Sequence, residues 1–194
     1  MNLPTAKHYA EKLYGWILPH CEPVRTCATL QVAGSIRRER PVCNDVDLVC
    51  IPKVIEERDM LGAVISRTNV LHKFLQDYVA NSQAEVRPTF QSGGEREGKS
   101  VILQLPKCQL DIWFATPETF ATRLLCRTGS MQHNIWLAER AQRQGKKWTP
   151  YEGIEANGGL IRFDSEERIY AELGLPYIEP KNRELDWLIK QFGQ

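Results

Sequence analysis

The sequence contains no long hydrophobic run. None of the apolar stretches in its 194 residues approaches the roughly 20 residues that a membrane-spanning helix needs. The N-terminal segment MNLPTAKHYAEKLYGW carries charges at positions where a secretory signal peptide is apolar. Both absences argue against a membrane-spanning or secreted protein, and we expect a soluble, cytoplasmic one.

The sequence also lacks the cysteine patterns of a zinc site. Its six cysteines include no CxxC pair, and no histidine stands at zinc-finger spacing from such a pair. Several of the cysteines fall in apolar, strand-like runs, where a thiol behaves as a small hydrophobic group. We therefore expect buried thiols, with a Cys21–Cys27 disulfide as the alternative.

A strong excess of one charge is missing as well. The chain has 25 Lys and Arg against 24 Asp and Glu, and a net charge of +1 does not by itself indicate a nucleic-acid-binding protein. The basic residues nevertheless cluster, once within residues 37–40 and once within residues 140–147. Either cluster alone is most often a solvated face.

Hydrophobic periodicity predicts a mixed first part and a mostly helical second part. It predicts helices over residues 4–18 and within residues 55–80, and strands at LQVAGS, DVDLVCIP, VILQLP and QLDIWFA. SGGEREGK is typical of a turn, and YEGIEANGGLIRF of a hairpin with an Asn-Gly turn. Further helices are expected at 116–126, 130–144, 164–174 and 182–192. We expect an α+β fold with two domains, residues 1–115 and 116–194.

Two aspartates, Asp45 and Asp47, lie one residue apart in an apolar strand. Side chains alternate across a strand, so both point to one face, where they repel each other. A divalent cation between them removes that repulsion, and carboxylate oxygens suit Mg²⁺ or Mn²⁺. If the strand CQLDIWF is a neighbour, Asp111 joins them, and such a cluster can hold two metals roughly 4 Å apart for nucleotidyl transfer. The alternative is a solvated Asp-x-Asp pair.

A Gly-Ser turn precedes these aspartates in GSIRRERPVCNDVDL, residues 34–48. Gly34 has no side chain, so backbone N–H groups there can approach a phosphate. The Ser35 hydroxyl can donate to a phosphate oxygen, and Arg38 can bind phosphate oxygens through its forked guanidinium. A lone Gly-Ser pair carries little information, but GSxRR followed by DxD at this distance indicates nucleotide chemistry.

These motifs resemble the nucleotidyltransferase superfamily, and specifically the DNA polymerase beta-like X family. RTGSMQHNIWLAERAQRQGKKWTPYEG resembles that family's TGS…N segment, and SEERIYAELGLPYIEPKNRE its C-terminal segment. The similarity spans about residues 28–185. It implies a nucleotidyltransferase palm with a mixed sheet, followed by a mostly helical C-terminal lobe with a small hairpin that binds nucleotide and DNA. It also implies DNA polymerase activity with two Mg²⁺ ions, for which Mn²⁺ can substitute.

The resemblance implies roles for the motif residues. Asp45 and Asp47 would bind both metals and the nucleotide triphosphate. Asp111 would bind the catalytic metal and help to activate the primer 3′-OH. Ser35 and Arg38 would hold the triphosphate.

Three further positions acquire roles in the same way. Gly34 belongs to the triphosphate-binding turn, and Gly129 would lie against the nucleotide sugar. The Gly129–Ser130 peptide is expected to be cis, and Asn134 would contact the base pair from the minor groove.

The sequence departs from the family pattern at the sugar and base contacts. Cys126 and Arg127 stand where relatives often have Tyr-Phe, which leaves ribonucleotide use open, and Met131 stands where a polar or acidic residue is common. Only about thirty residues precede the Gly-Ser turn, so we expect no helix-hairpin-helix domain and no lyase function. Modest, salt-sensitive binding of DNA would then depend on the second lobe, through Arg140, Arg143, Lys146 and Lys147.

These observations favour a monomeric, minimal X-family DNA polymerase that takes dNTPs and fills short gaps during DNA repair. One alternative is a template-independent nucleotidyltransferase that acts on RNA, on a protein or on a small-molecule hydroxyl. Another is a DNA-binding module that kept the fold without the chemistry.

Overall fold

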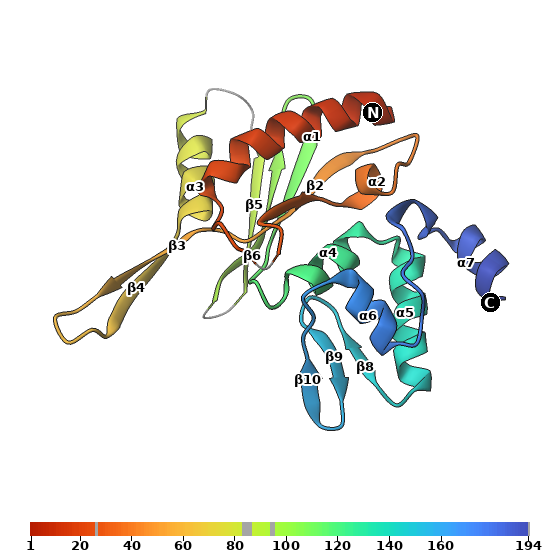
Figure 1. The fold of residues 1–194 in the computed structure, drawn as a ribbon. Helices are drawn as coiled ribbons and strands as arrows, with labels where there is room; N and C mark the ends of the chain where they lie inside the picture. Colours follow the sequence, from red (N-terminus) through yellow and green to blue (C-terminus); the bar gives the residue numbers. More distant parts are fainter. Residues whose placement is uncertain (26, 83–86, 94–95, 194) are drawn as a thin grey trace.

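The computed structural model describes residues 1–25, 27–82, 87–93 and 96–193, which form two lobes (Figure 1). The first lobe is built on a mixed five-stranded sheet with the strand order β1-β2-β7-β6-β5. These strands are β1 (Leu30–Val32), β2 (Asp45–Cys50), β7 (Gln109–Phe114), β6 (Arg96–Gln104) and β5 (Arg87–Gly93). The expected turn SGGEREGK includes residues 94 and 95, which lie outside the described residues.

Helices cover one face of this sheet (Figure 1). The first is α1 (Leu3–Ile17), which begins where the side chain of Asn2 accepts a hydrogen bond from the Thr5 amide. The helix α1 ends at Ile17, two residues before Pro19 and close to the predicted boundary. A short 3₁₀ helix, η1 (Leu18–His20), follows it. The buried face of α1, which includes Ala6 and Ala10, packs on the main core of the lobe.

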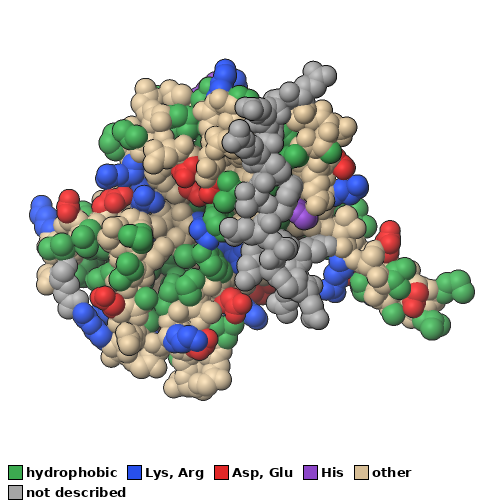
Figure 2. Space-filling view, turned by 180° about the vertical axis from the view of Figure 1, so that it is seen from behind, with side chains coloured by type: hydrophobic (Ala, Val, Ile, Leu, Met, Phe, Trp, Pro, Cys, Tyr) green, Lys and Arg blue, Asp and Glu red, His purple; other side chains and the backbone are tan. Residues whose placement is uncertain are grey.

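The predicted helix within residues 55–80 is wrong in its first half. There, β3 (Val54–Arg58) and β4 (Val64–Asn69) form a separate two-stranded hairpin, and only α3 (Val70–Asn81) is helical. The reason is local, because β-branched residues begin both strands and the Asp59 carboxylate accepts hydrogen bonds from two amides of the turn. Figure 2 shows the hairpin projecting from the body with hydrophobic side chains at its end. Met60 and Leu61 at this end are fully exposed.

Alternate residues of β2 and β7 point to opposite faces of the sheet, as the sequence predicts. Val46 and Leu48 of β2, with Leu110 and Ile112 of β7, are completely buried in the main core. The opposite face contributes Val49 and Trp113 to a second, smaller cluster. The aspartates share this second face, since they alternate with the main-core residues.

The second lobe is mostly helical and contains a small sheet. In chain order its elements are α4 (Phe120–Thr128), α5 (Met131–Arg143), β8 (Lys147–Thr149), β9 (Gly153–Ala156), β10 (Gly159–Ile161), α6 (Glu166–Glu172), η2 (Pro180–Asn182) and α7 (Leu185–Phe192). The predicted hairpin is β9–β10, with β8 as a third strand. The fold is therefore α+β, as expected, and consistent with a nucleotidyltransferase.

Two smaller expectations can be compared with the structure. All six cysteines are among the described residues and are thiols, so the alternative Cys21–Cys27 disulfide is not formed. No helix in the described part of the chain is long and apolar enough to cross a membrane.

Candidate active site

The three predicted carboxylates lie on two neighbouring strands. β2 and β7 are parallel, and their register places Asp47 opposite Asp111 and Asp45 opposite Gln109. The Asp47 carboxylate accepts a hydrogen bond from the indole nitrogen of Trp113 at 3.3 Å. The Asp111 carboxylate accepts one from the Gln109 amide at 2.8 Å. The strand that carries the third aspartate is therefore adjacent to the Asp-x-Asp strand.

Two of the carboxylates, Asp47 and Asp111, hold their protons more strongly than usual. Burial, followed by repulsion from Asp45 and Asp111, raises the pKa of Asp47 to about 7. Burial is also the main cause that raises the pKa of Asp111, and repulsion from Asp45 adds to it. A group of acids that resists ionisation in this way gains stability from a bound cation, because a cation favours the charged carboxylates.

The donor set fits hard divalent cations, although the side chains do not yet enclose one. Among the described residues, no group of three His, Cys, Asp or Glu side chains is arranged to hold a metal ion. One carboxylate oxygen of Asp47 and one of Asp111 accept hydrogen bonds from the neighbouring side chains of Trp113 and Gln109. The chemistry of the donors, three carboxylates near one pocket, is the set that Mg²⁺ and Mn²⁺ prefer.

The turn after β1 presses directly against Asp47. Gly34 begins the short helix α2 (Gly34–Arg37) with a φ of +59°, and a Cβ there would lie 2.0 Å from an Asp47 carboxylate oxygen. Only glycine meets both conditions. The Ser35 hydroxyl oxygen is buried and has no hydrogen-bond partner among the described residues. Such an orphaned group in a pocket wall is consistent with a ligand that completes it.

Arg38 joins the turn to the second lobe. Its Nε donates to the Glu184 carboxylate at 2.8 Å, and its Nη1 donates to the carbonyl of Thr128. Both contacts fix the guanidinium at the pocket wall. The motif predicted Arg38 as a phosphate ligand, whereas Glu184 carried no local signal that pointed to this contact.

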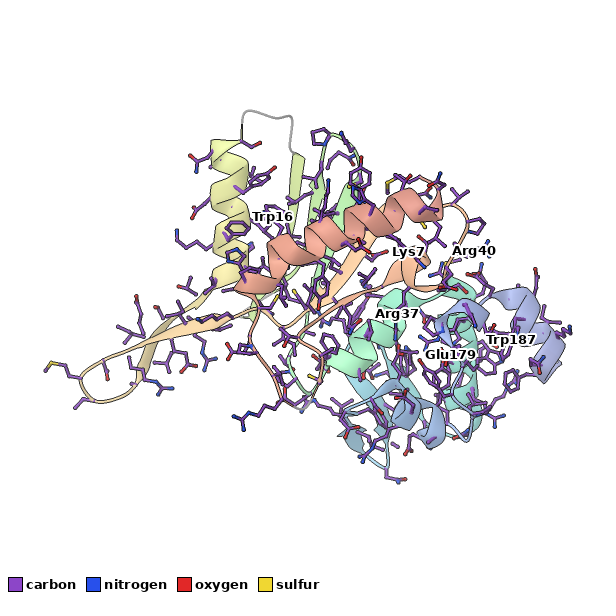
Figure 3. All side chains as sticks on the ribbon, turned by 45° about the horizontal axis from the view of Figure 1, so that its top comes forward. Lys7, Trp16, Arg37, Arg40, Glu179 and Trp187 are labelled. Atoms are coloured by element: carbon purple, nitrogen blue, oxygen red, sulfur yellow. The ribbon has the colours of Figure 1, made fainter. Side chains whose placement is uncertain are left out.

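Arg37 makes a second link between the lobes that the sequence interpretation missed. Its guanidinium forms a two-pronged pair with Glu166 of α6, both distances being 2.8 Å, and also donates to the Thr128 hydroxyl at 2.7 Å. Figure 3 shows Arg37 at the junction of the two lobes. In the sequence, Arg37 was visible only as the first arginine of the Arg37–Arg38 pair.

Glu166 is shared with a fully buried arginine, Arg183, at 3.0 and 3.1 Å. Burial alone would raise the pKa of Glu166, but the hydrogen bonds from Arg37 and Arg183 outweigh it and lower this pKa to about 2. The Arg183 carbonyl accepts hydrogen bonds from the hydroxyl and the amide of Ser130. The ion network therefore holds the Gly129–Ser130 turn, whose peptide bond is cis as expected.

One pocket of about 670 Å³ brings most of the predicted residues together. Its lining includes every predicted nucleotide-binding residue and two of the three aspartates: Gly34, Ser35, Arg38, Asp45, Asp47, Cys126, Arg127, Gly129 and Asn134. Asp111 lies beside the pocket rather than in its lining. The amide of Asn134 donates to the Cys126 carbonyl at 2.8 Å, while its oxygen is buried and unpaired among the described residues.

The predicted DNA-binding residues lie away from this pocket, and part of the set has structural contacts. Arg140 donates to the Leu173 carbonyl at 3.3 Å, and Lys146 contacts the carbonyl and carboxylate of Glu172 at 2.6 and 2.7 Å. Lys147 pairs with Glu155 at the surface. Arg143 is exposed.

Comparison with known proteins shows a similarity to DNA polymerases. The DNA polymerase beta thumb family model matches residues 123–184. The chain is 29% identical over 180 residues to the DNA polymerase/3′-5′ exonuclease PolX of Bacillus subtilis, which is 91% of this chain and 28% of that protein. It is 37% identical over 60 residues to DNA polymerase IV of Saccharomyces cerevisiae, which is 31% of this chain and 10% of that protein. The chain thus spans only a minor part of each relative's length, and what the comparisons show is a similarity to these DNA polymerases and to the DNA polymerase beta thumb.

Proposed function

We propose that this protein is a DNA polymerase that adds a deoxynucleoside monophosphate to a primer 3′-OH and fills short gaps in DNA. The observation that carries the proposal is the register of β2 and β7, which sets Asp47 opposite Asp111 at the edge of the pocket. The similarity to DNA polymerases supports it. In the reaction the 3′-oxygen bonds to the α-phosphorus of the dNTP, and the bond to pyrophosphate breaks.

Each motif residue has a role in that reaction. Asp45 and Asp47 would hold two Mg²⁺ ions against the triphosphate, and Asp111 would hold the ion nearer the primer. Bound there, the ions supply Lewis acidity at the reacting phosphate, and Mn²⁺ can substitute. Asp111 would also help to remove the proton of the 3′-OH.

The pocket wall would bind the rest of the nucleotide. Ser35 can donate its unpaired hydroxyl to a phosphate oxygen, and Arg38 can turn the free edge of its guanidinium to the same group. Gly129 would lie against the sugar, and Asn134 against the base pair. The protein would act as a monomer on gapped DNA or on a primer-template.

A second candidate, template-independent transfer, is favoured by one observation. The side of α5 that lines the pocket around Asn134 is otherwise apolar, with Met131, Ile135 and Ala138. Met131 and Ile135 are 68% and 51% exposed. Apolar side chains stack on any base and hydrogen-bond to none, so this wall discriminates poorly between bases.

A primer-extension assay tests the proposal and separates it from the second candidate. Gapped duplex, primer-template and single-stranded primer are each supplied with Mg²⁺ and one dNTP or NTP at a time. We expect templated dNMP addition that Asp111→Asn reduces by about a thousandfold, because a metal contributes several kcal/mol to the transition state. The control is Asp77→Asn, the same substitution at an exposed position of α3.

Two results would contradict the proposal. Primer extension that persists in Asp111→Asn would contradict the proposed role of Asp111 in catalysis. Equal extension of single-stranded and templated primers, without template-directed choice of base, would favour the template-independent transferase.

A further inference from the structure

Arg127 occupies an unusual position beside the carboxylates. It lies at the end of α4, and its guanidinium carbon is 3.0 Å from the centroid of the Trp113 ring. The same carbon is 4.7 Å from the centroid of the Tyr151 ring, and Nη2 donates to the Tyr151 hydroxyl. A cation held on the faces of two aromatic rings is stabilised by their negative face charge without being neutralised.

Among the described residues, no carboxylate neutralises this guanidinium by direct contact. In the described part of the chain, Arg127 forms no ion pair within 4.0 Å, and its buried Nε has no hydrogen-bond partner. Its full charge therefore acts on its surroundings through space. The carboxylates exposed to this charge include those of Asp45 and Asp47, which line the same pocket as Arg127.

Trp113 connects Arg127 physically to the same site. One face of its ring carries the guanidinium, while its indole nitrogen donates to Asp47 at 3.3 Å. Trp113 lies two residues beyond Asp111 on β7 and shares its face of the strand. A movement of Arg127 off the ring therefore changes the surroundings of both facing aspartates.

We propose that Arg127 is a built-in counter-cation of the metal-free site, a positioning residue that lowers the affinity of the carboxylates for divalent metals. The inference rests on the proposed function, because it takes the three aspartates as the metal ligands. A guanidinium near two carboxylates offsets part of their mutual repulsion. A divalent ion that enters must then overcome the repulsion of that same guanidinium.

The proposal predicts how metal binding responds to the charge at position 127. Arg127→Met keeps a long apolar side chain that can cover Trp113 but removes the charge. It should bind Mn²⁺ more tightly, on the order of tenfold. Arg127→Lys keeps the charge and should bind Mn²⁺ close to the wild-type affinity. The matched control is Arg168→Met, an exposed arginine of α6 that pairs with Asp164 at the surface.

The experiment measures Mn²⁺ binding to the whole chain by the loss of the free-ion electron paramagnetic resonance signal, without DNA or nucleotide. Thermal unfolding of each variant establishes that it is folded. Should Arg127→Met unfold, Arg127→Gln gives the same comparison, because it is also uncharged.

The outcomes separate the inference from the proposed function. If Asp111→Asn does not weaken Mn²⁺ binding, the carboxylates are not the metal site and the proposed function fails. If Asp111→Asn weakens binding but Arg127→Met binds no more tightly than wild type, the counter-cation role is overturned. Tighter binding in Arg127→Met, with Arg127→Lys and Arg168→Met unchanged, supports it.

Discussion

Asp47 of β2 and Asp111 of β7 are direct partners across two parallel strands. Buried residues on the other face of each strand, among them Val46 and Ile112, fix this register, because a slip by one residue would expose them. The same slip would turn Asp111 into the core. The register that buries the apolar face of the sheet therefore also brings the three carboxylates together.

Ionisation of Asp47 should destabilise the metal-free protein. Its pKa is about 7 in the folded chain, against an ordinary value of 3.8, because burial and then Asp45 and Asp111 raise it. The folded state thus holds this proton more strongly. Its contribution to stability is complete below about pH 4 and is lost as the pH rises through about 7.

Asp47→Asn removes this titration while keeping a similar shape. In EDTA, we expect the variant to unfold at a temperature higher than wild type by roughly 3–8 °C at pH 8. The two proteins should converge near pH 4. Scanning calorimetry at both pH values measures the difference in unfolding temperature. Equal unfolding temperatures at pH 8 would show that the ionised Asp47 side chain does not destabilise the folded protein.

Gly34→Ala should abolish the site, whereas a similar change elsewhere should not. Gly34 and Gly158 both have positive φ values, +59° and +76°, so alanine strains the backbone at either position. Only at Gly34 would the new Cβ meet Asp47, at 2.0 Å, since nothing lies within 4 Å of Gly158. Backbone strain should cost each variant about 1 kcal/mol of stability, and the contact with Asp47 adds to the loss in Gly34→Ala; urea unfolding measures both.

The function of the two glycine variants should differ far more than their stability. Gly34→Ala should lose Mn²⁺ binding and primer extension, and Gly158→Ala should retain both. Metal binding that survives in Gly34→Ala would mean that the close approach to Asp47 is not required.

Local patterns were sufficient for the parts of the site that depend on strand alternation. Asp45 and Asp47 could be assigned to one face because alternation along a strand has a fixed period, whereas Asp111 joins them only if its strand is a neighbour. The helix within residues 55–80 was wrong because Met60 and Leu61 fit a helical spacing, although they lie exposed at the end of a hairpin. Apolar spacing alone does not tell whether a residue is buried.

Long-range charge pairs left no local pattern to detect. Arg37 and Glu166 are 129 residues apart in the chain, and their contact depends on how the two lobes meet. The same holds for Arg127, whose position on the Trp113 ring follows from the packing of α4 beside β7. Sequence periodicity describes one element at a time and cannot assign such partners.

The second basic cluster should divide into a structural and a DNA-binding part. Lys146 contacts Glu172 through two hydrogen bonds, so Lys146→Ala should lose about 1–3 kcal/mol of unfolding free energy. Arg143 is exposed, and Arg143→Ala should leave stability unchanged while weakening DNA binding.

The salt dependence of DNA binding distinguishes a phosphate contact from an indirect effect. Removal of one phosphate contact lowers the slope of log affinity against log salt by about 1. Fluorescence anisotropy with gapped DNA across salt concentrations measures that slope. An unchanged slope in Arg143→Ala would remove this residue from the DNA-binding surface.

Glu166 should be the most costly single residue to remove from the junction between the lobes. It neutralises both Arg37 and the fully buried Arg183, so Glu166→Ala leaves two cations without their partner. We expect a loss of about 3–5 kcal/mol in unfolding free energy. Glu167→Ala is the matched control, because it is the exposed neighbour on the same helix.

The pH dependence gives the Glu166 prediction a second, independent measurement. The pKa of Glu166 is lowered to about 2 from an ordinary value of 4.5. Its contribution to stability is therefore present above about pH 4.5 and is lost as the pH falls toward 2. The difference between wild type and Glu166→Ala, taken from urea unfolding, should shrink across this interval. A difference that stays constant with pH would mean that Glu166 stabilises the junction by packing rather than by its charge.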